Sequence, residues 1–176
     1  VSILTGQYAW RHTITGNDPA KPEEDAARAA GTTGREILNQ RMDRMETLPR
    51  VLEQAGYASL QTGKWWQGNY TRGGFTHGMT KGTRHGDDGL KIGRKTMQPI
   101  YDFIGEAQRD GKPFFVWYAP FLPHEPHTPP KDLLEKYKAR TDSLPMARYY
   151  AMCEWLDRTC GELVDHLDAR GLRENT

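Results

Sequence analysis

The chain has 176 residues, the size of one ordinary domain. Its 24 Lys and Arg residues are nearly balanced by 23 Asp and Glu residues, giving a formal net charge of +1. This balance argues against a sequence-independent nucleic-acid binder, which needs a basic excess or a basic stripe. No apolar run reaches the roughly 18 residues of a membrane-spanning helix, so we expect no membrane partner.

The first part of the chain predicts only short elements. The apolar beginning, Val1–His12, is typical of the end of a helix. Turn-forming and charged residues without periodicity predict a loop over Thr13–Thr33. Thr47 is a candidate N-cap for a short helix over Leu48–Ala55, and Gly56 can end that helix.

Two strands are expected further along the chain. The first covers Tyr57–Thr62, and the second lies in the continuous apolar run Pro113–Pro120, which is typical of a central parallel strand buried on both faces. Between them, Gln67–Lys95 contains eight glycines and no periodicity, and loops of this length are usually functional or disordered. Three helices with apolar residues at helical spacing are expected at Thr96–Asp110, Lys131–Tyr137 and Leu144–Arg170.

The order of these elements predicts an α/β fold, with helices on both faces of a mostly parallel central sheet. No repeat or linker divides the chain, so one domain is expected. Cys153 and Cys160 lie two helical turns apart in the last helix, about 10.5 Å at 1.5 Å rise per residue. This separation is too large for a disulfide, and we expect both cysteines to be small core residues.

Residues with useful chemistry follow both predicted strands, where ligands bind in parallel α/β sheets. Lys64 and Trp66 follow the first strand, and His124, Glu125 and His127 follow the second. A lysine in a glycine-bounded turn suits sulfate or phosphate oxygens, and a histidine on a proline-rich loop suits proton donation to a leaving oxygen. Each of these residues taken alone is also compatible with an ordinary surface position.

Other motifs are less specific. The spacing of His124 and His127 on a proline-rich loop, with no Cys nearby, argues against zinc. The segment around His85 predicts a turn that carries an acid–base pair or a substrate-binding patch, or else an ordinary surface Asp-Gly turn. The absence of GxGxxG and phosphate-loop motifs argues against nucleotide binding.

Four segments carry motifs that occur in the same order in one known family. They are Ser2–Gln7 (SILTGQ), Leu48–Trp65 (LPRVLEQAGYASLQTGKW), Pro113–Pro130 (PFFVWYAPFLPHEPHTPP) and Tyr149–Thr176. Together they resemble the formylglycine-dependent (type I) sulfatases of the alkaline-phosphatase-like superfamily. The fold that this resemblance implies is the α/β sandwich of that superfamily.

The resemblance also implies which groups do the chemistry. A residue five positions before Val1 would be converted to formylglycine, and the ligands of a Ca²⁺ ion would lie outside this chain. Residues 1–176 would then be the central portion of a catalytic domain truncated at both ends, without metal ligands of its own. Lys64 would bind the sulfate group, and His124 would donate to the sulfate and its leaving oxygen. Trp66 stands where the family has a histidine.

This departure makes Trp66 a candidate wall of the substrate pocket and makes His85 or His77 a candidate replacement for the missing histidine. The implied activity is hydrolysis of a sulfated carbohydrate or an aryl sulfate in a periplasmic, extracellular or lysosomal location, with the 176-residue chain alone expected to be inactive. Two alternatives stay open: a phosphodiester or phosphonate monoester hydrolase of the same superfamily, and a non-catalytic binder of sulfated glycans. No oligomeric state is implied.

Overall fold

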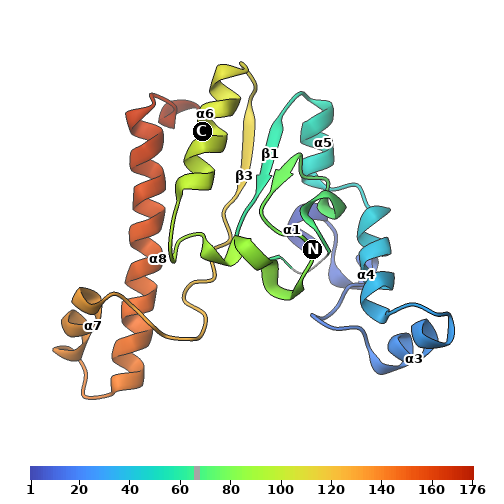
Figure 1. Ribbon diagram of the computed structural model, residues 1–176, viewed down its shortest axis with the longest axis horizontal. Coiled ribbons are helices and arrows are strands. Elements are labelled where there is room, and N and C mark those ends of the chain that lie inside the picture. Colours follow the sequence, from blue (N-terminus) through green and yellow to red (C-terminus); the bar gives the residue numbers. More distant parts are fainter. Residues whose placement is uncertain (66–67) are drawn as a thin grey trace.

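The computed structural model describes residues 1–65 and 68–176 (Figure 1). Its helices and strands are, in chain order, α1 (Ser2–Thr5), α2 (Ala9–His12), α3 (Lys21–Ala29), α4 (Gly34–Asp43), α5 (Leu48–Gln54), β1 (Ala58–Gln61), β2 (His77–Gly78), α6 (Gln98–Arg109), β3 (Phe114–Trp117), α7 (Lys131–Lys138) and α8 (Leu144–Ala169). Three short 3₁₀ segments complete it: η1 (Tyr70–Gly73), η2 (Arg84–Lys91) and η3 (Arg173–Asn175). Within these residues, no helix is both long and apolar enough to cross a membrane.

The three strands form a parallel sheet in the order β2–β1–β3, which confirms the predicted α/β class. Ala58 of β1 lies opposite Phe114 of β3, and Leu60 lies opposite both Val116 and His77. The prediction that the apolar run forms the central strand is wrong for the described sheet. There β1 is central and fully buried, whereas β3 lies at an edge and is half-buried.

The central strand can contain polar residues because the long loop satisfies them. Ser59 donates its N–H to Thr76 Oγ1 at 2.8 Å, and the Thr76 hydroxyl donates to Ser59 O at 2.9 Å. The Gln61 side chain donates to Gly63 O and accepts from Thr80 N at 3.2 Å. These buried polar groups therefore have partners, which removes most of the cost of burying them.

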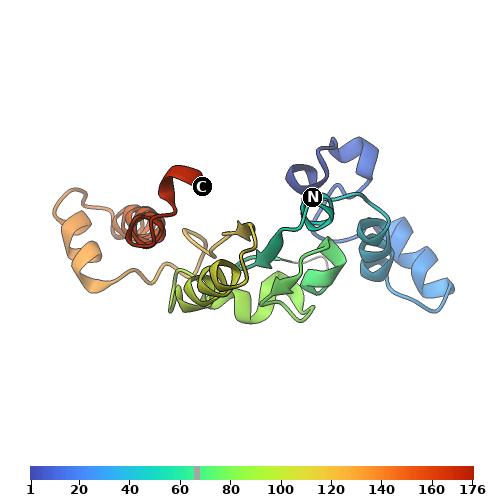
Figure 2. The same cartoon turned by 90° about the horizontal axis from the view of Figure 1, so that it is seen from above.

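Successive residues of β3 enter two separate apolar cores. Phe114 and Val116 pack with α6 and α8 in a core that contains Leu60, Ile100 and Ile104. The intervening residues of β3 pack on the other side in a second core, which contains Leu4, Leu38, Met42, Trp65 and Phe75. Both views place α7 and α8 on one side of the strands and α3 to α5 on the other (Figures 1 and 2). The continuous apolar run thus reflects contacts on both faces of β3.

Two expectations for the first third of the chain are wrong. The predicted loop Thr13–Thr33 contains α3, whose first turn has Pro22 and two glutamates that favour a helix N-terminus. Arg41 of α4 pairs with Glu23 at 2.6 Å, so α3 is held by polar contacts that leave no apolar periodicity. The expected helix end at Val1–His12 is two short helices, separated at Gly6 in a left-handed conformation.

Three further details differ from expectation. Thr47 occupies the N-cap position of α5 as expected, but its hydroxyl donates to Gly73 O at 2.7 Å and forms no capping hydrogen bond. Cys153 is half-buried and Cys160 is exposed, and both are free thiols, so they are not core residues. The buried positions of α8 are occupied instead by Ala147, Ala151, Met152 and Thr159.

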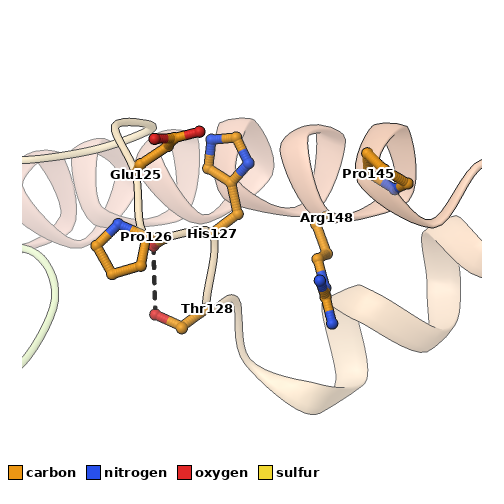
Figure 3. Close-up of a pocket in the computed structure, with 6 residues that line it drawn as sticks. All are labelled: Glu125, Pro126, His127, Thr128, Pro145 and Arg148. Atoms are coloured by element: carbon orange, nitrogen blue, oxygen red, sulfur yellow. Dashed lines mark hydrogen bonds between the residues drawn. The ribbon is translucent and has the colours of Figure 1, made fainter.

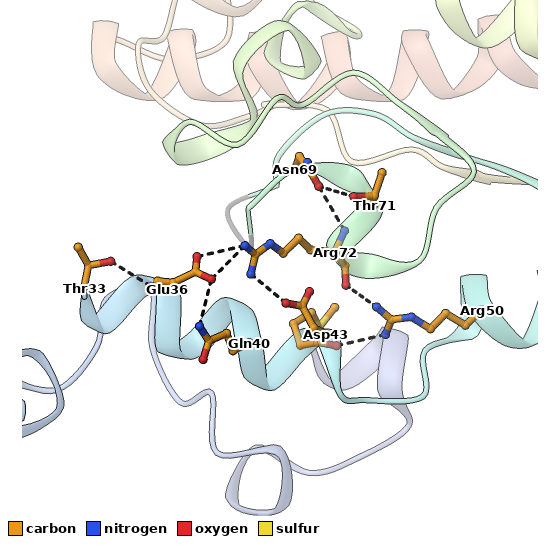
Figure 4. A network of polar contacts seen from close by, with 9 residues as sticks. Thr33, Glu36, Gln40, Asp43, Arg50, Asn69, Thr71 and Arg72 are labelled. Carbon is orange, nitrogen blue, oxygen red and sulfur yellow. Dashed lines mark hydrogen bonds and ion pairs between the residues drawn. The ribbon is translucent and has the colours of Figure 1, made fainter. Parts of the chain in front are cut away.

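An arginine fixes the start of the long loop to α4. Arg72 Nη2 pairs with Glu36 Oε1 at 3.0 Å, and Arg72 Nη1 pairs with Asp43 Oδ2 at 2.9 Å (Figure 4). Arg50 of α5 donates to the carbonyl of Arg72 at 2.8 Å. The loop that follows β1 is therefore attached to two helices before it returns to the sheet edge.

Candidate functional site

The two strand ends that the sequence singled out are joined directly. Thr62, just after β1, donates its N–H and its hydroxyl to Trp117 O at 3.1 and 2.7 Å. Lys64 then donates its N–H to Ala119 O at 2.7 Å. Because the strands are parallel neighbours, these bonds place the turn that contains Lys64 beside the loop that follows β3.

Gly63 is required for this close approach. Its φ is +74°, and a Cβ built on it would lie 1.8 Å from Ala119 O. Gly86 and Gly89 of η2 pack over the same turn, since a Cβ on either would lie within 2.5 Å of Gly63 O. Only glycine, which has no Cβ, allows three backbone segments to meet here.

This packing brings His85 to the turn. The His85 carbonyl accepts a hydrogen bond from Trp65 N at 3.3 Å, and its backbone has φ +74°. Asp87 also has a positive φ, and its Oδ2 accepts bonds from Thr80 Oγ1 and from the amides of residues 81, 82 and 83. Burial favours the protonated acid, but these bonds outweigh it and hold the pKa of Asp87 below its usual value. Backbone strain of this kind is concentrated at functional sites.

The predicted lysine and histidine line one pocket of about 570 Å³. Its lining includes Lys64, Phe121, His124, Glu125, His127 and Tyr149. The His124 ring is exposed, and its Nδ1 lies 2.9 Å from Glu125 O. A carbonyl only accepts, so Nδ1 carries the proton and Nε2 is left to accept when neutral or to donate when charged.

Phe121 lies between these groups. Its ring stacks on the His124 ring with centroids 4.1 Å apart, and Lys64 Nζ lies 5.5 Å from its centroid. The His85 ring centroid is 6.4 Å from the same phenyl ring. The structure therefore gathers Lys64, His85 and His124 around Phe121, which sequence reasoning missed. The only signal for Phe121 was its position at the end of the apolar run.

Arg94 is the second residue that sequence reasoning missed. It donates to the carbonyls of Phe121, at 2.8 Å, and Pro126, at 3.2 Å, and also to that of His124. Partial burial lowers the pKa of Arg94, which nevertheless stays charged because its usual value is so far above neutral. Nothing in the local sequence distinguishes Arg94 from a surface cation.

The other residues predicted for the site differ in whether they line this pocket. Trp66 lies outside the described residues. His77 packs on Phe103 of α6, with ring centroids 5.2 Å apart, and is not among the residues that line the pocket. His127 lines the pocket, and its ring lies 5.8 Å from that of Tyr149 on α8.

The pocket continues into a second space of about 730 Å³. The two share Glu125 and His127, and the second is also lined by Pro145 and Arg148 of α8 (Figure 3). The combined trough carries positive groups, aromatic rings and one carboxylate. Two adjoining spaces of these volumes suit a ligand larger than a single small ester.

No metal site is formed by the part of the chain that the structure describes. There, no three His, Cys, Asp or Glu side chains converge in a way that could hold an ion. These residues therefore do not fit the Ca²⁺ ion that the resemblance implies, and no chemical step below is derived through it.

A lysine and a histidine line one pocket beyond adjacent ends of parallel strands, the place where ligands bind in α/β folds. The family model described as Sulfatase matches residues 1–176, so the chain belongs to the sulfatase family. Its sheet and helices are those of the alkaline-phosphatase-like fold. A comparison with curated proteins found no match.

Solved structures share this fold at low identity. The crystal structure of Ps i-CgsB in complex with k-i-k-neocarrahexaose has a TM-score of 0.60 and 17% identity, and another structure of Ps i-CgsB has 0.62 and 16%. A Bacteroides thetaiotaomicron structure described with the metabolism of multiple glycosaminoglycans has 0.65 and 16%. Each alignment covers 97% of this chain. The chain spans only 44% of both Ps i-CgsB chains and 45% of the Bacteroides chain.

Proposed function

We propose that the full-length protein hydrolyses sulfuric esters and that residues 1–176 are the central portion of its catalytic domain. The observation that carries the proposal is the shared pocket of Lys64 and His124, which Phe121 connects. Family membership supports the reaction class, and the alignment with only 44–45% of each matched structure supports a portion of a longer chain.

The two side chains have different tasks. The Lys64 ammonium is a compact charge that stabilises negative charge as it develops on the sulfuryl oxygens. His124, with Nδ1 held by Glu125 O, presents Nε2 to donate a proton to the leaving oxygen. Formylglycine, which the family supplies from outside this chain, would provide the nucleophile. A location outside the cytosol, in the periplasm, the extracellular space or the lysosome, belongs to the same proposal.

The substrate class is a sulfated carbohydrate. The trough continues past Glu125 and His127 toward Arg148, which leaves room for sugar units on one side of the sulfate pocket. The His127 and Tyr149 rings offer a donor and stacking faces, and Trp66 would add a further wall. His85 lies near Phe121 but does not line the trough, so a role in substrate binding would need contact with the substrate from outside it. Ps i-CgsB, which shares the fold, has been crystallised with a neocarrahexaose.

The test is turnover of matched esters by the purified full-length protein. A sulfate and a phosphate ester of the same alcohol are compared, first with an aryl and then with a sugar alcohol. We expect hydrolysis of the sulfate esters, with loss of activity in the Lys64→Ala variant. Preferred hydrolysis of the phosphate esters would instead indicate a phosphodiesterase-like enzyme. Tight binding of a sulfated glycan without turnover would indicate a binding protein.

A further inference from the structure

We infer that Arg94 is a positioning residue that holds His124 in place for the proposed reaction, an inference that rests on the proposed function. Arg94 does not line the pocket, but its guanidinium reaches three carbonyls of the loop that carries His124. Nε donates to Phe121 O, Nη1 to Pro126 O and Nη2 to His124 O. The rigid fork of the guanidinium therefore fixes the loop before, at and after the histidine.

The backbone of Arg94 is itself well anchored. Ile92 is fully buried in the core that packs against the sheet. Gly93, which directly precedes Arg94, donates its N–H to Thr96 O at 3.2 Å. Gly93 has φ +75°, and a Cβ on it would lie 3.0 Å from Pro120 and 3.1 Å from the Tyr118 hydroxyl. The turn that carries Arg94 is thus packed against the end of β3, which holds the backbone of Arg94 in place relative to the loop that follows β3.

The guanidinium of Arg94 donates its hydrogen bonds to backbone carbonyls. Its hydrogen-bond partners among the residues that the structure describes are three neutral backbone carbonyls. A half-buried guanidinium is expected to find an acidic partner. Three carbonyl partners on one loop instead point to control of loop geometry.

A contact with Phe121 gives Arg94 a second means of positioning His124. The guanidinium carbon lies 5.5 Å from the Phe121 centroid, the same distance as Lys64 Nζ, and cations are attracted to the face of an aromatic ring. His124 stacks on this ring as well. Arg94 thereby holds both the backbone of the histidine and the ring on which it stacks, although its own side chain does not line the pocket.

The test is a double-mutant cycle in the full-length protein with Arg94→Ala, His124→Ala and the double variant. Each is assayed on a sugar sulfate and on a nitrophenyl sulfate. We expect Arg94→Ala to lower kcat/KM on the sugar sulfate by about 10²-fold, a loss typical of a catalytic group displaced by about 1 Å. The loss on the nitrophenyl sulfate should be distinctly smaller, because its leaving group barely needs a proton. In the His124→Ala background, Arg94→Ala should have almost no further effect.

Two variants separate positioning from general damage. Arg94→Lys keeps the charge but cannot reach three carbonyls, so its kinetics should resemble those of Arg94→Ala. If the alanine variant does not fold, Arg94→Lys replaces it in the double-mutant cycle. Added guanidinium should restore part of the activity of Arg94→Ala. Lys95→Ala removes an exposed cation from the same turn and should leave the kinetics unchanged.

The outcomes distinguish this inference from the proposed function. If the wild-type protein hydrolyses no sulfuric ester, the proposed function fails. A different result overturns the positioning role alone. In it, the wild-type protein hydrolyses sulfuric esters and His124→Ala shows the leaving-group dependence, but the Arg94 variants lose kcat/KM equally on both substrates and the losses from Arg94→Ala and His124→Ala multiply in the double variant. Full activity of Arg94→Lys would also overturn it, since a point charge would then suffice.

Discussion

The ring of His124 stacks on the ring of Phe121, with centroids 4.1 Å apart and planes inclined by 24°. The stack and the contact of Nδ1 with Glu125 O restrict the imidazole in two directions, although its surface is exposed. An exposed histidine without such contacts would sample several rotamers. This one has its Nε2 fixed relative to the pocket before any substrate arrives.

The first prediction follows from that orientation. His124→Ala should lower kcat/KM by roughly 10²–10⁴-fold on a sugar sulfate, whose alkoxide leaving group needs a proton. The loss should be distinctly smaller on a nitrophenyl sulfate, whose acidic phenol leaves readily. Steady-state kinetics on both substrates provide the measurement. Equal losses would leave His124 as a sulfate ligand without a role at the leaving oxygen.

The second prediction concerns Lys64. Lys64→Ala should lower kcat/KM by about two orders of magnitude or more, roughly 3 kcal/mol of transition-state stabilisation, on every sulfate ester. Lys64→Arg should restore little, because a planar fork replaces a compact charge on the Phe121 ring. Lys112→Ala, an exposed lysine at the opposite end of β3, is the control. Near-normal kinetics of Lys64→Ala would refute the sulfate-binding role.

The elements that the sequence predicts correctly are those whose apolar side chains are buried, because burial produces a pattern of apolar residues. The helices α6, α7 and α8 and the strand β1 lie within two residues of their expected bounds, and β3 lies inside the apolar run Pro113–Pro120. The helix α3 was missed because charged contacts such as Arg41–Glu23 hold it, and such contacts leave no apolar stripe. The edge position of β3 was missed because an apolar run reports contacts above and below the sheet but not the number of neighbouring strands.

Some residues of the candidate site could be predicted from the sequence, and others could not. Lys64 and His124 follow strands, so their place at one sheet edge could be expected from the strand assignments. The contribution of Arg94 could not, because its partners are backbone carbonyls 27 to 32 residues away, and any residue can supply a carbonyl. The backbone of His85 reaches the site through the glycine contacts at Gly63, which no sequence periodicity predicts.

The third prediction uses the acid limb of the stability profile. The folded-state pKa of Asp87 lies below the ordinary value of 3.8, so the unfolded chain binds the proton more tightly. The stabilisation by this carboxylate is therefore complete above pH 3.8 and is lost as the pH falls through the lowered folded-state pKa. Asp87→Asn should reduce the free energy of unfolding at neutral pH by about 1 kcal/mol, since exposed charge-assisted bonds are screened.

Denaturant titrations of the full-length protein between about pH 6 and pH 3 check this prediction. Asp87→Asn should also flatten the loss of stability at the acid end, because the replaced carboxylate no longer takes up a proton. Asp25→Asn, which alters an exposed carboxylate of α3, should change the neutral-pH stability by less than about 0.5 kcal/mol. An unchanged acid limb in Asp87→Asn would contradict the assignment.

The last prediction tests the close approach at Gly63 against a matched glycine. Gly63→Ala must adopt φ +74° and places a Cβ 1.8 Å from the carbonyl oxygen of Ala119, so the turn and the end of β3 must move apart. Gly111 ends α6 with a similar φ of +63°, but a Cβ there meets no atom within 4 Å. Gly111→Ala should therefore cost only the left-handed strain, about 1–2 kcal/mol. Gly63→Ala should cost a further 1–3 kcal/mol or more from overpacking, roughly the loss seen in crowded cores.

Because the displaced turn carries Lys64, Gly63→Ala should also lower kcat/KM on sulfate esters, whereas Gly111→Ala should lower stability alone. Chemical denaturation and steady-state kinetics of the two variants in the full-length protein separate the two effects. Equal destabilisation by both substitutions would mean that the backbone of Gly63 does not lie against Ala119 as described. Normal kinetics in a folded Gly63→Ala variant would mean that the position of Lys64 tolerates a shift of this turn, and the proposed role of its ammonium would lose its geometric basis.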